Sequence, residues 1–110
     1  MNNPGIWPCL TYDDAAVARD FLLGVLGFTD ALTVRGEDGT TIVHAEANWP
    51  EGGGVMYGST ATSNHPDIPQ PSGIQWLCVY TADPDAVYRR AVAAGATVVT
   101  EPTDTDYGSH

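Results

Sequence analysis

The sequence predicts an α+β fold built from one β-α-β-β-β unit that occurs twice, the second time incompletely. A repeated phrase is the first reason: residues 11–19 read Thr-Tyr-Asp-Asp-Ala-Ala-Val-Ala-Arg, and residues 81–89 read Thr-Ala-Asp-Pro-Asp-Ala-Val-Tyr-Arg. An apolar run precedes each copy and a glycine follows it, which is typical of a strand that leads into a helix. After the first copy, alternating apolar residues between glycine-rich turns indicate further strands.

The first unit begins with a strand expected at Ile6 to Tyr12 and a helix expected at Asp13 to Leu26. Asp13 is suited to cap this helix, because its carboxylate can accept the free amide protons of the first turn. Apolar residues recur every four positions and form one stripe: Val17, Phe21 and Val25. Gly27 can adopt the left-handed conformation that ends a helix.

Three more strands are expected to complete the first unit, at residues 31–35, 40–48 and 55–59. The turns between them contain the glycines that hairpins favour. The middle strand alternates, so that His44, Glu46 and Asn48 leave one face while smaller apolar residues leave the other.

The second unit follows a linker rich in Ser, Asn and Pro. We predict a single domain over residues 1–110, with module one at 5–60, the linker at 61–72 and an incomplete module two at 73–110. Module two has a strand expected at 74–80, a helix at 83–94 and the start of a strand at 97–101. Asp83 and Pro84 suit the cap and first turn of that helix.

Charge is the unusual feature of the composition. The 110 residues include four arginines, no lysine and fourteen acids, giving a formal net charge of −10. Such a protein repels nucleic acid and anionic membranes, and it favours neutral or cationic ligands. The simpler interpretation is that acidity keeps the protein soluble. The sequence starts without a signal peptide, and no apolar run is long enough to span a membrane, so we expect a cytoplasmic location.

The two cysteines are expected to be unpaired. The two copies of the repeated phrase start seventy residues apart, at residues 11 and 81, whereas Cys9 and Cys78 are sixty-nine residues apart. Because of this one-residue difference, their side chains should leave opposite faces of their strands. Each should then behave as a small hydrophobic residue.

Leu26-Gly27-Phe28 ends the first helix, and the tail contains Ala-Ala-Gly-Ala-Thr-Val-Val at 93–99 and Asp-Tyr-Gly-Ser at 106–109. With the repeated unit, these motifs resemble the vicinal oxygen chelate superfamily of glyoxalases, bleomycin-resistance proteins and extradiol dioxygenases, in its glyoxalase-like branch. The resemblance covers nearly the whole chain. It implies paired modules whose curled mixed sheet forms a cup, with the helices outside and a cavity within.

The resemblance also implies positions for metal ligands, and this sequence does not supply them. The first-strand ligand, usually His or Gln, lies seven residues before the capping Asp, where this chain has Ile6 and Trp76. The fourth-strand ligand is usually Glu, but residues 52–63 contain no Asp, Glu or His. The last ligand would lie beyond residue 110. A shift of one residue would bring Gln75 to the second position, yet we expect no metal and no cofactor.

If Ile6 and Trp76 faced the cup, strand alternation would place apolar and aromatic side chains beside them: Pro8, Leu10, Tyr12, Cys78 and Tyr80, with Val55 and Tyr57 or else Met56. Aromatic rings suit a planar or cationic ligand, but they can equally fill a small core. His44 and Glu46 could be an acid/base pair, a polar anchor or a solvated face. Trp49 could cover a ligand or anchor a dimer. The predicted ligand-binding residues are Tyr12, His44, Glu46, Trp49, Tyr57, Trp76 and Tyr80.

Two functions follow from these observations. The first is a metal-independent, bleomycin-resistance-like protein that binds and sequesters a cationic or aromatic small molecule. The alternative is a metal-dependent lyase or isomerase of the glyoxalase or epimerase type, so enzymatic activity stays open. The missing hairpin should leave a sheet edge exposed, which predicts a homodimer in which the modules can be exchanged.

Overall fold

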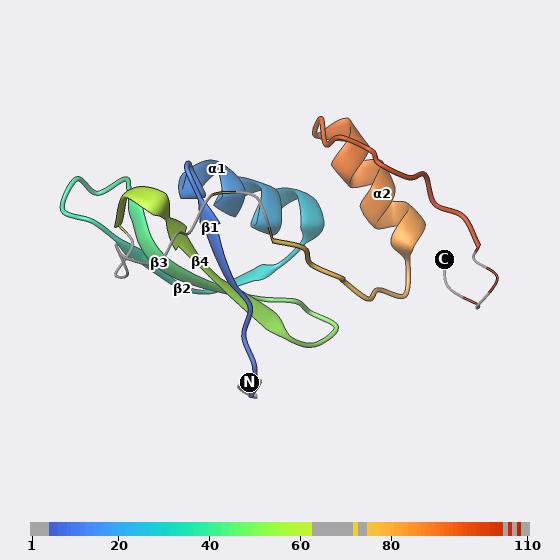
Figure 1. The fold of residues 1–110 in the computed structure, drawn as a ribbon, viewed down its shortest axis with the longest axis horizontal. Coiled ribbons are helices and arrows are strands. Elements are labelled where there is room, and N and C mark those ends of the chain that lie inside the picture. The colour runs from blue at the N-terminus through green and yellow to red at the C-terminus, as the bar shows by residue number, and fades with distance from the viewer. Residues whose placement is uncertain (1–4, 63–71, 73–74, 105, 107, 109–110) are drawn as a thin grey trace.

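The computed structural model describes residues 5–62, 72, 75–104, 106 and 108. It has the predicted α+β class, with four strands in one mixed sheet and helices at one side (Figure 1). The sheet order is β1-β4-β3-β2, and the sheet is open. β1 (Cys9–Tyr12) pairs in parallel with β4 (Gly54–Ser59). β3 (Ile42–Asn48) pairs antiparallel with β4 and with β2 (Thr29–Arg35).

The first helix forms in the predicted region, but its cap lies one residue later than expected. It consists of α1 (Ala15–Asp20) and a π-helical continuation, η1 (Phe21–Leu26). Asp14 is the cap, because its Oδ1 accepts a hydrogen bond from the amide of Val17 at 3.1 Å. The assignment of Asp13 was therefore wrong: the Asp13 carboxylate instead accepts a hydrogen bond from the Thr60 hydroxyl at 3.0 Å. Gly27 ends the helix with a φ of 97°.

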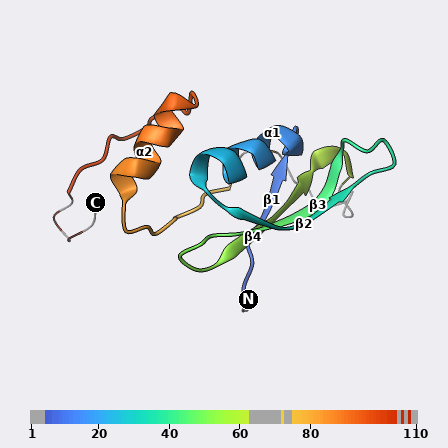
Figure 2. The ribbon, with the colours of Figure 1, turned by 180° about the vertical axis from the view of Figure 1, so that it is seen from behind.

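The hydrophobic core lies between this helix and the sheet, in the first half of the chain. Its buried members are Leu10, Ala15, Leu22, Phe28, Ile42, Ala45, Ala47, Val55 and Tyr57. The sheet register explains the set, because Leu10, Tyr57 and Ala45 are direct neighbours across three strands and share one face. Figure 2 shows the same arrangement from behind, with the helix over one face of the sheet.

The face of the sheet away from the helix carries the alternate residues, and we call it the open face. Its neighbours across β1, β4, β3 and β2 are Cys9, Met56, Glu46 and Leu32, followed on the next row by His44 and Val34. Gly58 of β4 also belongs to this face. A Cβ atom there would lie 2.6 Å from the carbonyl oxygen of Val43, so the strands approach too closely for any side chain.

The second half contributes one helix, α2 (Pro84–Ala93), whose cap was predicted correctly. The Asp83 side chain accepts a hydrogen bond from the amide of Ala86 at 3.0 Å, and Pro84 occupies the first turn. α2 has no buried residue and lies beyond the end of η1 (Figure 1). Arg90 joins the two, because its guanidinium donates to the carbonyl oxygens of Val25 at 2.8 Å and Leu26 at 3.1 Å.

Two expected strands of the second half were wrong. Residues 75–80 and 97–101 are in no strand, while Ile74, the linker residues 63–71 and the tail residues 107, 109 and 110 lie outside the described residues. The physical reason is that a strand needs a neighbouring strand to pair its N–H and C=O groups. Within the described part of one chain, neither segment pairs with the sheet, whose four strands all come from residues 9–59.

Candidate functional site

A hollow of about 490 Å³ lies at one end of the sheet, where the β3–β4 turn meets residues 77–80. We call it the end hollow. Its lining is mainly apolar and comprises Ile6, Pro8, Phe28, Trp49, Glu51, Gly52, Gly53, Gly54, Val55, Leu77, Cys78, Val79 and Tyr80. Phe28 and Val55 are core residues, so the core forms one wall of the hollow and the second half forms another.

Glycines shape the turn that borders the hollow. Gly52 and Gly53 have φ values of 123° and 85°, a region that residues with a Cβ rarely adopt. The turn is closed by hydrogen bonds from the Trp49 amide to the Gly53 carbonyl and from the Gly52 amide to the Trp49 carbonyl, both 2.9 Å. Gly54 has no room for a side chain, because a Cβ would lie 2.9 Å from the ring of Trp7.

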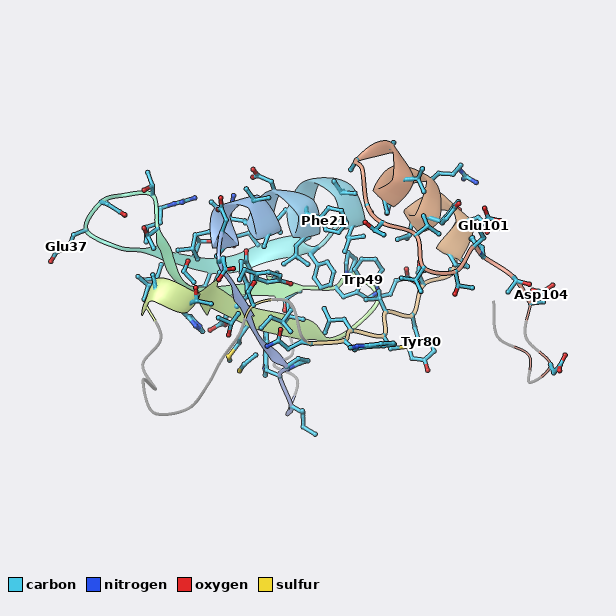
Figure 3. The ribbon with its side chains drawn as sticks, turned by 45° about the horizontal axis from the view of Figure 1, so that its top comes forward. Phe21, Glu37, Trp49, Tyr80, Glu101 and Asp104 are labelled. Carbon is cyan, nitrogen blue, oxygen red and sulfur yellow. The ribbon has the colours of Figure 1, made fainter. Side chains whose placement is uncertain are left out.

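Trp49 connects the two walls of the end hollow. Its indole packs on the Phe28 ring, with 5.0 Å between the ring centroids, and its Nε1 donates to the carbonyl oxygen of Tyr80 at 2.7 Å. Figure 3 shows Trp49 and Tyr80 close together at this end of the sheet. The Tyr80 side chain is 82% exposed, so its ring stands at the mouth of the hollow.

Among the described residues of this lining, Glu51 is the one Asp, Glu, Arg or His, and both of its carboxylate oxygens are already hydrogen-bonded. Oε1 accepts from the Thr81 hydroxyl at 2.7 Å, and Oε2 accepts from the Ala82 amide at 2.8 Å. With the Trp49 to Tyr80 bond, these contacts hold the chain that leads from residues 77–80 into α2.

His44 and Glu46 lie on the open face, separate from the end hollow. His44 Nε2 lies 2.9 Å from Glu46 Oε2, and their side chains are 40% and 26% exposed. The alternation predicted for β3 is therefore confirmed for this pair. Met56 lies directly across from Glu46, and Cys9 lies across from Met56.

Tyr12 and Tyr57 lie on the opposite, helix-covered side of the sheet. Their rings meet edge to face with 6.3 Å between centroids. Burial raises the pKa of both phenols above the ordinary tyrosine value. Tyr57 is only 2% exposed, and among the described residues its hydroxyl has no hydrogen-bond partner.

The structure thus places the seven predicted ligand residues in separate locations. Trp49 and Tyr80 meet at the end hollow, His44 and Glu46 share the open face, and Tyr12 and Tyr57 contact the core. Trp76 is 95% exposed and lines none of these. The prediction that these residues share one face of a cup is not met, because the Leu10 and Tyr12 side chains of β1 point toward the helix. The sequence analysis did not select Phe28 or Glu51 as lining residues. Two signals were present: Phe28 follows the glycine that ends the helix, and Glu51 lies in a glycine-rich turn.

Comparison with known proteins identifies the fold. Residues 7–110 match the sequence model of the Glyoxalase/Bleomycin resistance protein/Dioxygenase superfamily. The chain belongs to this superfamily. The crystal structure of TioX from Micromonospora sp. ML1 is similar, with 29% sequence identity and a TM-score of 0.77 over 96% of this chain and 84% of that one. No curated protein matches.

Metal-dependent members of the glyoxalase superfamily raise the question of whether this chain could hold a metal. Among the described residues, no group of three or more His, Cys, Asp or Glu side chains is arranged to do so. Ile6 and Trp76, at two of the family's ligand positions, carry no donor atom suited to a divalent metal and are 87% and 95% exposed. At these two positions the described residues therefore supply no ligand of the kind that such members use. None of the described helices is long and apolar enough to cross a bilayer.

Proposed function

We propose that this glyoxalase-superfamily protein binds a small aromatic molecule, neutral or cationic, in the end hollow without a metal. The observation that carries the proposal is the apolar hollow of about 490 Å³ between Trp49 and Tyr80. Ligand sites in proteins typically have volumes of about 300–1,000 Å³ and a mainly apolar lining with few polar groups. The Trp49 and Tyr80 rings supply surfaces on which a planar ligand can stack.

Charge supports a neutral or cationic ligand rather than an anion. Glu51 is the one charged side chain among the described lining residues, and the whole chain has a net charge of −10. An anion would enter against this field and find no cationic partner in the lining. A cation would also be attracted to the faces of the aromatic rings.

Binding and sequestration, in the manner of the bleomycin-resistance type, fit this lining better than turnover. A general acid or base needs a free position within hydrogen-bond reach of a substrate. The Glu51 carboxylate already accepts hydrogen bonds from Thr81 and Ala82, so its role in the proposal is to hold the wall of the hollow.

The proposal includes a homodimer in the cytoplasm, with no nucleic-acid or membrane partner. Cys9 and Cys78 are both free and exposed, a state that the reducing cytoplasm maintains. The net charge of −10 disfavours phosphate-rich partners. α2 has no buried residue in one copy of the chain, which favours a second copy.

Calorimetric titration with matched aromatic ligands tests the function. The panel contains a planar cationic dye, a neutral aromatic of similar size and an anionic one. We expect the first two to bind with micromolar dissociation constants and the anion to bind at least tenfold more weakly. Trp49→Phe keeps a ring for stacking but loses the indole N–H that binds the Tyr80 carbonyl, so it should weaken binding by up to about tenfold, the order of one hydrogen bond.

Two valines provide a matched control for this titration. Val79 lines the end hollow, whereas Val99 is 95% exposed and does not. Val79→Ala should weaken binding severalfold, and Val99→Ala should leave the affinity unchanged. Absence of binding across the whole panel, or equal effects of the two valine variants, would contradict the proposed function.

A further inference from the structure

One wall of the end hollow lies outside the hydrophobic core. Phe28 and Val55, on the first wall, are core residues. The second wall is part of residues 77–82, which we call the strap. The strap supplies four exposed lining residues, Leu77, Cys78, Val79 and Tyr80, and within the described part of the chain it pairs with no strand. α2, which follows the strap, has no buried residue. Polar contacts must therefore hold the strap wall in place.

Three hydrogen bonds fasten the strap to the turn between β3 and β4. Trp49 Nε1 donates to the Tyr80 carbonyl oxygen at 2.7 Å. The Glu51 carboxylate accepts from the Thr81 hydroxyl at 2.7 Å and from the Ala82 amide at 2.8 Å. All three bonds lie at exposed positions, where water can replace each partner. A segment held by exposed polar contacts opens at a lower free energy than a packed core does.

The Glu51 contact continues into the cap of α2. The Thr81 hydroxyl, which donates to Glu51, also accepts a hydrogen bond from the Asp83 amide at 3.2 Å. The Asp83 carboxylate in turn accepts from the Ala86 amide, in the first turn of α2, at 3.0 Å. Hydrogen bonds in such a chain polarise and strengthen one another. The negative charge of Glu51 near the amino-terminal end of α2 also suits the helix dipole. A change at either end of this chain of hydrogen bonds should therefore affect the other end.

Arg90 attaches the other end of α2 to the first half. Its guanidinium, in the last turn of α2, donates to the carbonyl oxygens of Val25 at 2.8 Å and Leu26 at 3.1 Å. Both carbonyls belong to the last residues of η1. These bonds do not involve Glu51, so α2 can stay attached through Arg90 while the strap separates from the turn.

We propose that the strap and α2 form a movable wall of the end hollow, and that Glu51 is the latch that keeps this wall closed. A ligand in the hollow contacts both walls only when the strap is closed, so its binding favours the closed arrangement. Occupancy of the hollow is then transmitted to the cap of α2 through Thr81 and Asp83. This inference deepens the proposed function and rests on it for the ligand, whereas the latch is a property of the ligand-free chain.

Amide hydrogen exchange of the full, ligand-free chain, followed by mass spectrometry, tests the latch. Glu51→Gln removes the charge and one acceptor oxygen, so exchange over residues 85–93 should accelerate by at least about tenfold, the order of one hydrogen bond to a charged group. Exchange in β3 and β4 should not change, because backbone groups pair these strands. Unchanged exchange in α2, or equal acceleration in β3 and β4, would overturn the proposal.

Glu37→Gln is the matched control for Glu51→Gln. Glu37 is an exposed acid in the turn between β2 and β3, and Figure 3 shows it at the opposite end of the molecule from Trp49 and Tyr80. The substitution makes the same change of charge away from the strap, so exchange in α2 should stay at the wild-type rate. An acceleration equal to that of Glu51→Gln would mean that net charge, and not the latch, controls α2.

Thr81→Val tests the same latch from the strap side. Valine keeps the shape of threonine but can neither donate to Glu51 nor accept from the Asp83 amide. Thr81→Val should also accelerate exchange in α2. The two substitutions together should accelerate exchange by less than the product of their separate factors, because they remove the same hydrogen bond. Fully multiplicative effects would show that Glu51 and Thr81 act independently, which contradicts the latch.

Proflavine, a planar aromatic cation, supplies the ligand-bound measurement. At a hundred times its dissociation constant it should slow exchange in α2 of the wild-type chain by up to about a hundredfold. In stopped-flow fluorescence, proflavine should leave the Glu51→Gln variant faster than wild type and leave the Glu37→Gln variant at the wild-type rate. Proflavine that binds without slowing exchange in α2 would overturn the coupling and leave the proposed function standing. Absence of proflavine binding would count against the proposed ligand, and the ligand-free exchange then decides the latch by itself.

Discussion

The two helical halves of this protein are specified by the same local signals, yet only one of them builds a core. Asp14 and Asp83 cap their helices in the same way, and Gly27 and Gly95 follow the helix ends with φ values of 97° and 89°. The first helix buries side chains against the sheet, whereas α2 has no buried residue. Local capping is therefore enough to form a helix, whereas burial of its side chains requires a sheet beside it.

The largest expected difference between the halves comes from removing an apolar side chain in each. Leu22, in η1, is 3% exposed, so Leu22→Ala should lower the free energy of unfolding by about 2–5 kcal/mol. Val92, in α2, is 44% exposed, and Val92→Ala should change it by less than about 0.5 kcal/mol. Urea unfolding followed by circular dichroism measures both. Comparable losses would mean that α2 contributes to the same core.

Removing each helix cap should change stability less than Leu22→Ala does, and the two caps should affect different measurements. Asp14→Ala and Asp83→Ala each delete a side chain that accepts an amide hydrogen bond, a loss of about 0.5–2 kcal/mol of helix stability. Because α1 is part of the core, Asp14→Ala should lower the urea midpoint. Asp83→Ala should leave that midpoint in place and speed amide hydrogen exchange in α2 alone. A drop in the global midpoint for Asp83→Ala would mean instead that α2 unfolds together with the core.

The smallest expected effect concerns Tyr57. Its substitution by Phe distinguishes a residue of the core from a residue that binds ligand. Its hydroxyl is buried without a partner among the described residues, and such a group costs stability. Tyr57→Phe should therefore leave the free energy of unfolding unchanged or raise it by up to about 1 kcal/mol, with unchanged ligand affinity. Ser59→Ala is the control, since the Ser59 hydroxyl donates to the Ile42 carbonyl at 2.8 Å and its loss should destabilise. Weaker ligand binding in Tyr57→Phe would place Tyr57 in the site.

Much of the fold could be predicted from the sequence, because its signals are local. The helix over residues 84–93 follows from Asp83 and Pro84, and the shared face of His44 and Glu46 follows from strand alternation. The choice between Asp13 and Asp14 as a cap could not be made, because adjacent carboxylates have the same chemistry. The facing of Tyr12 was equally undetermined, since both sides of β1 carry apolar residues.

The candidate site was only partly predictable, because it joins segments that lie far apart in the chain. Trp49 and Tyr80 were chosen for their rings, and the structure brings them together through a hydrogen bond across thirty-one residues. Phe28 and Glu51 become lining residues only once the β3–β4 turn is folded against residues 77–80. Residues 75–80 have the composition of a strand but no strand beside them.

Sequence alone was enough to predict the α+β class, the strand and helix order of the first half, the glycines that follow both helices and the cap of the second helix. Capping carboxylates, glycine conformations and the two-residue period of a strand act within a few residues, so they can be read without a structure. Three features depend instead on the folded chain: which sheet face the helix covers, where the hollow lies, and that residues 75–80 pair with no strand in the described part of one chain. Those outcomes depend on packing between distant segments, which no local pattern encodes.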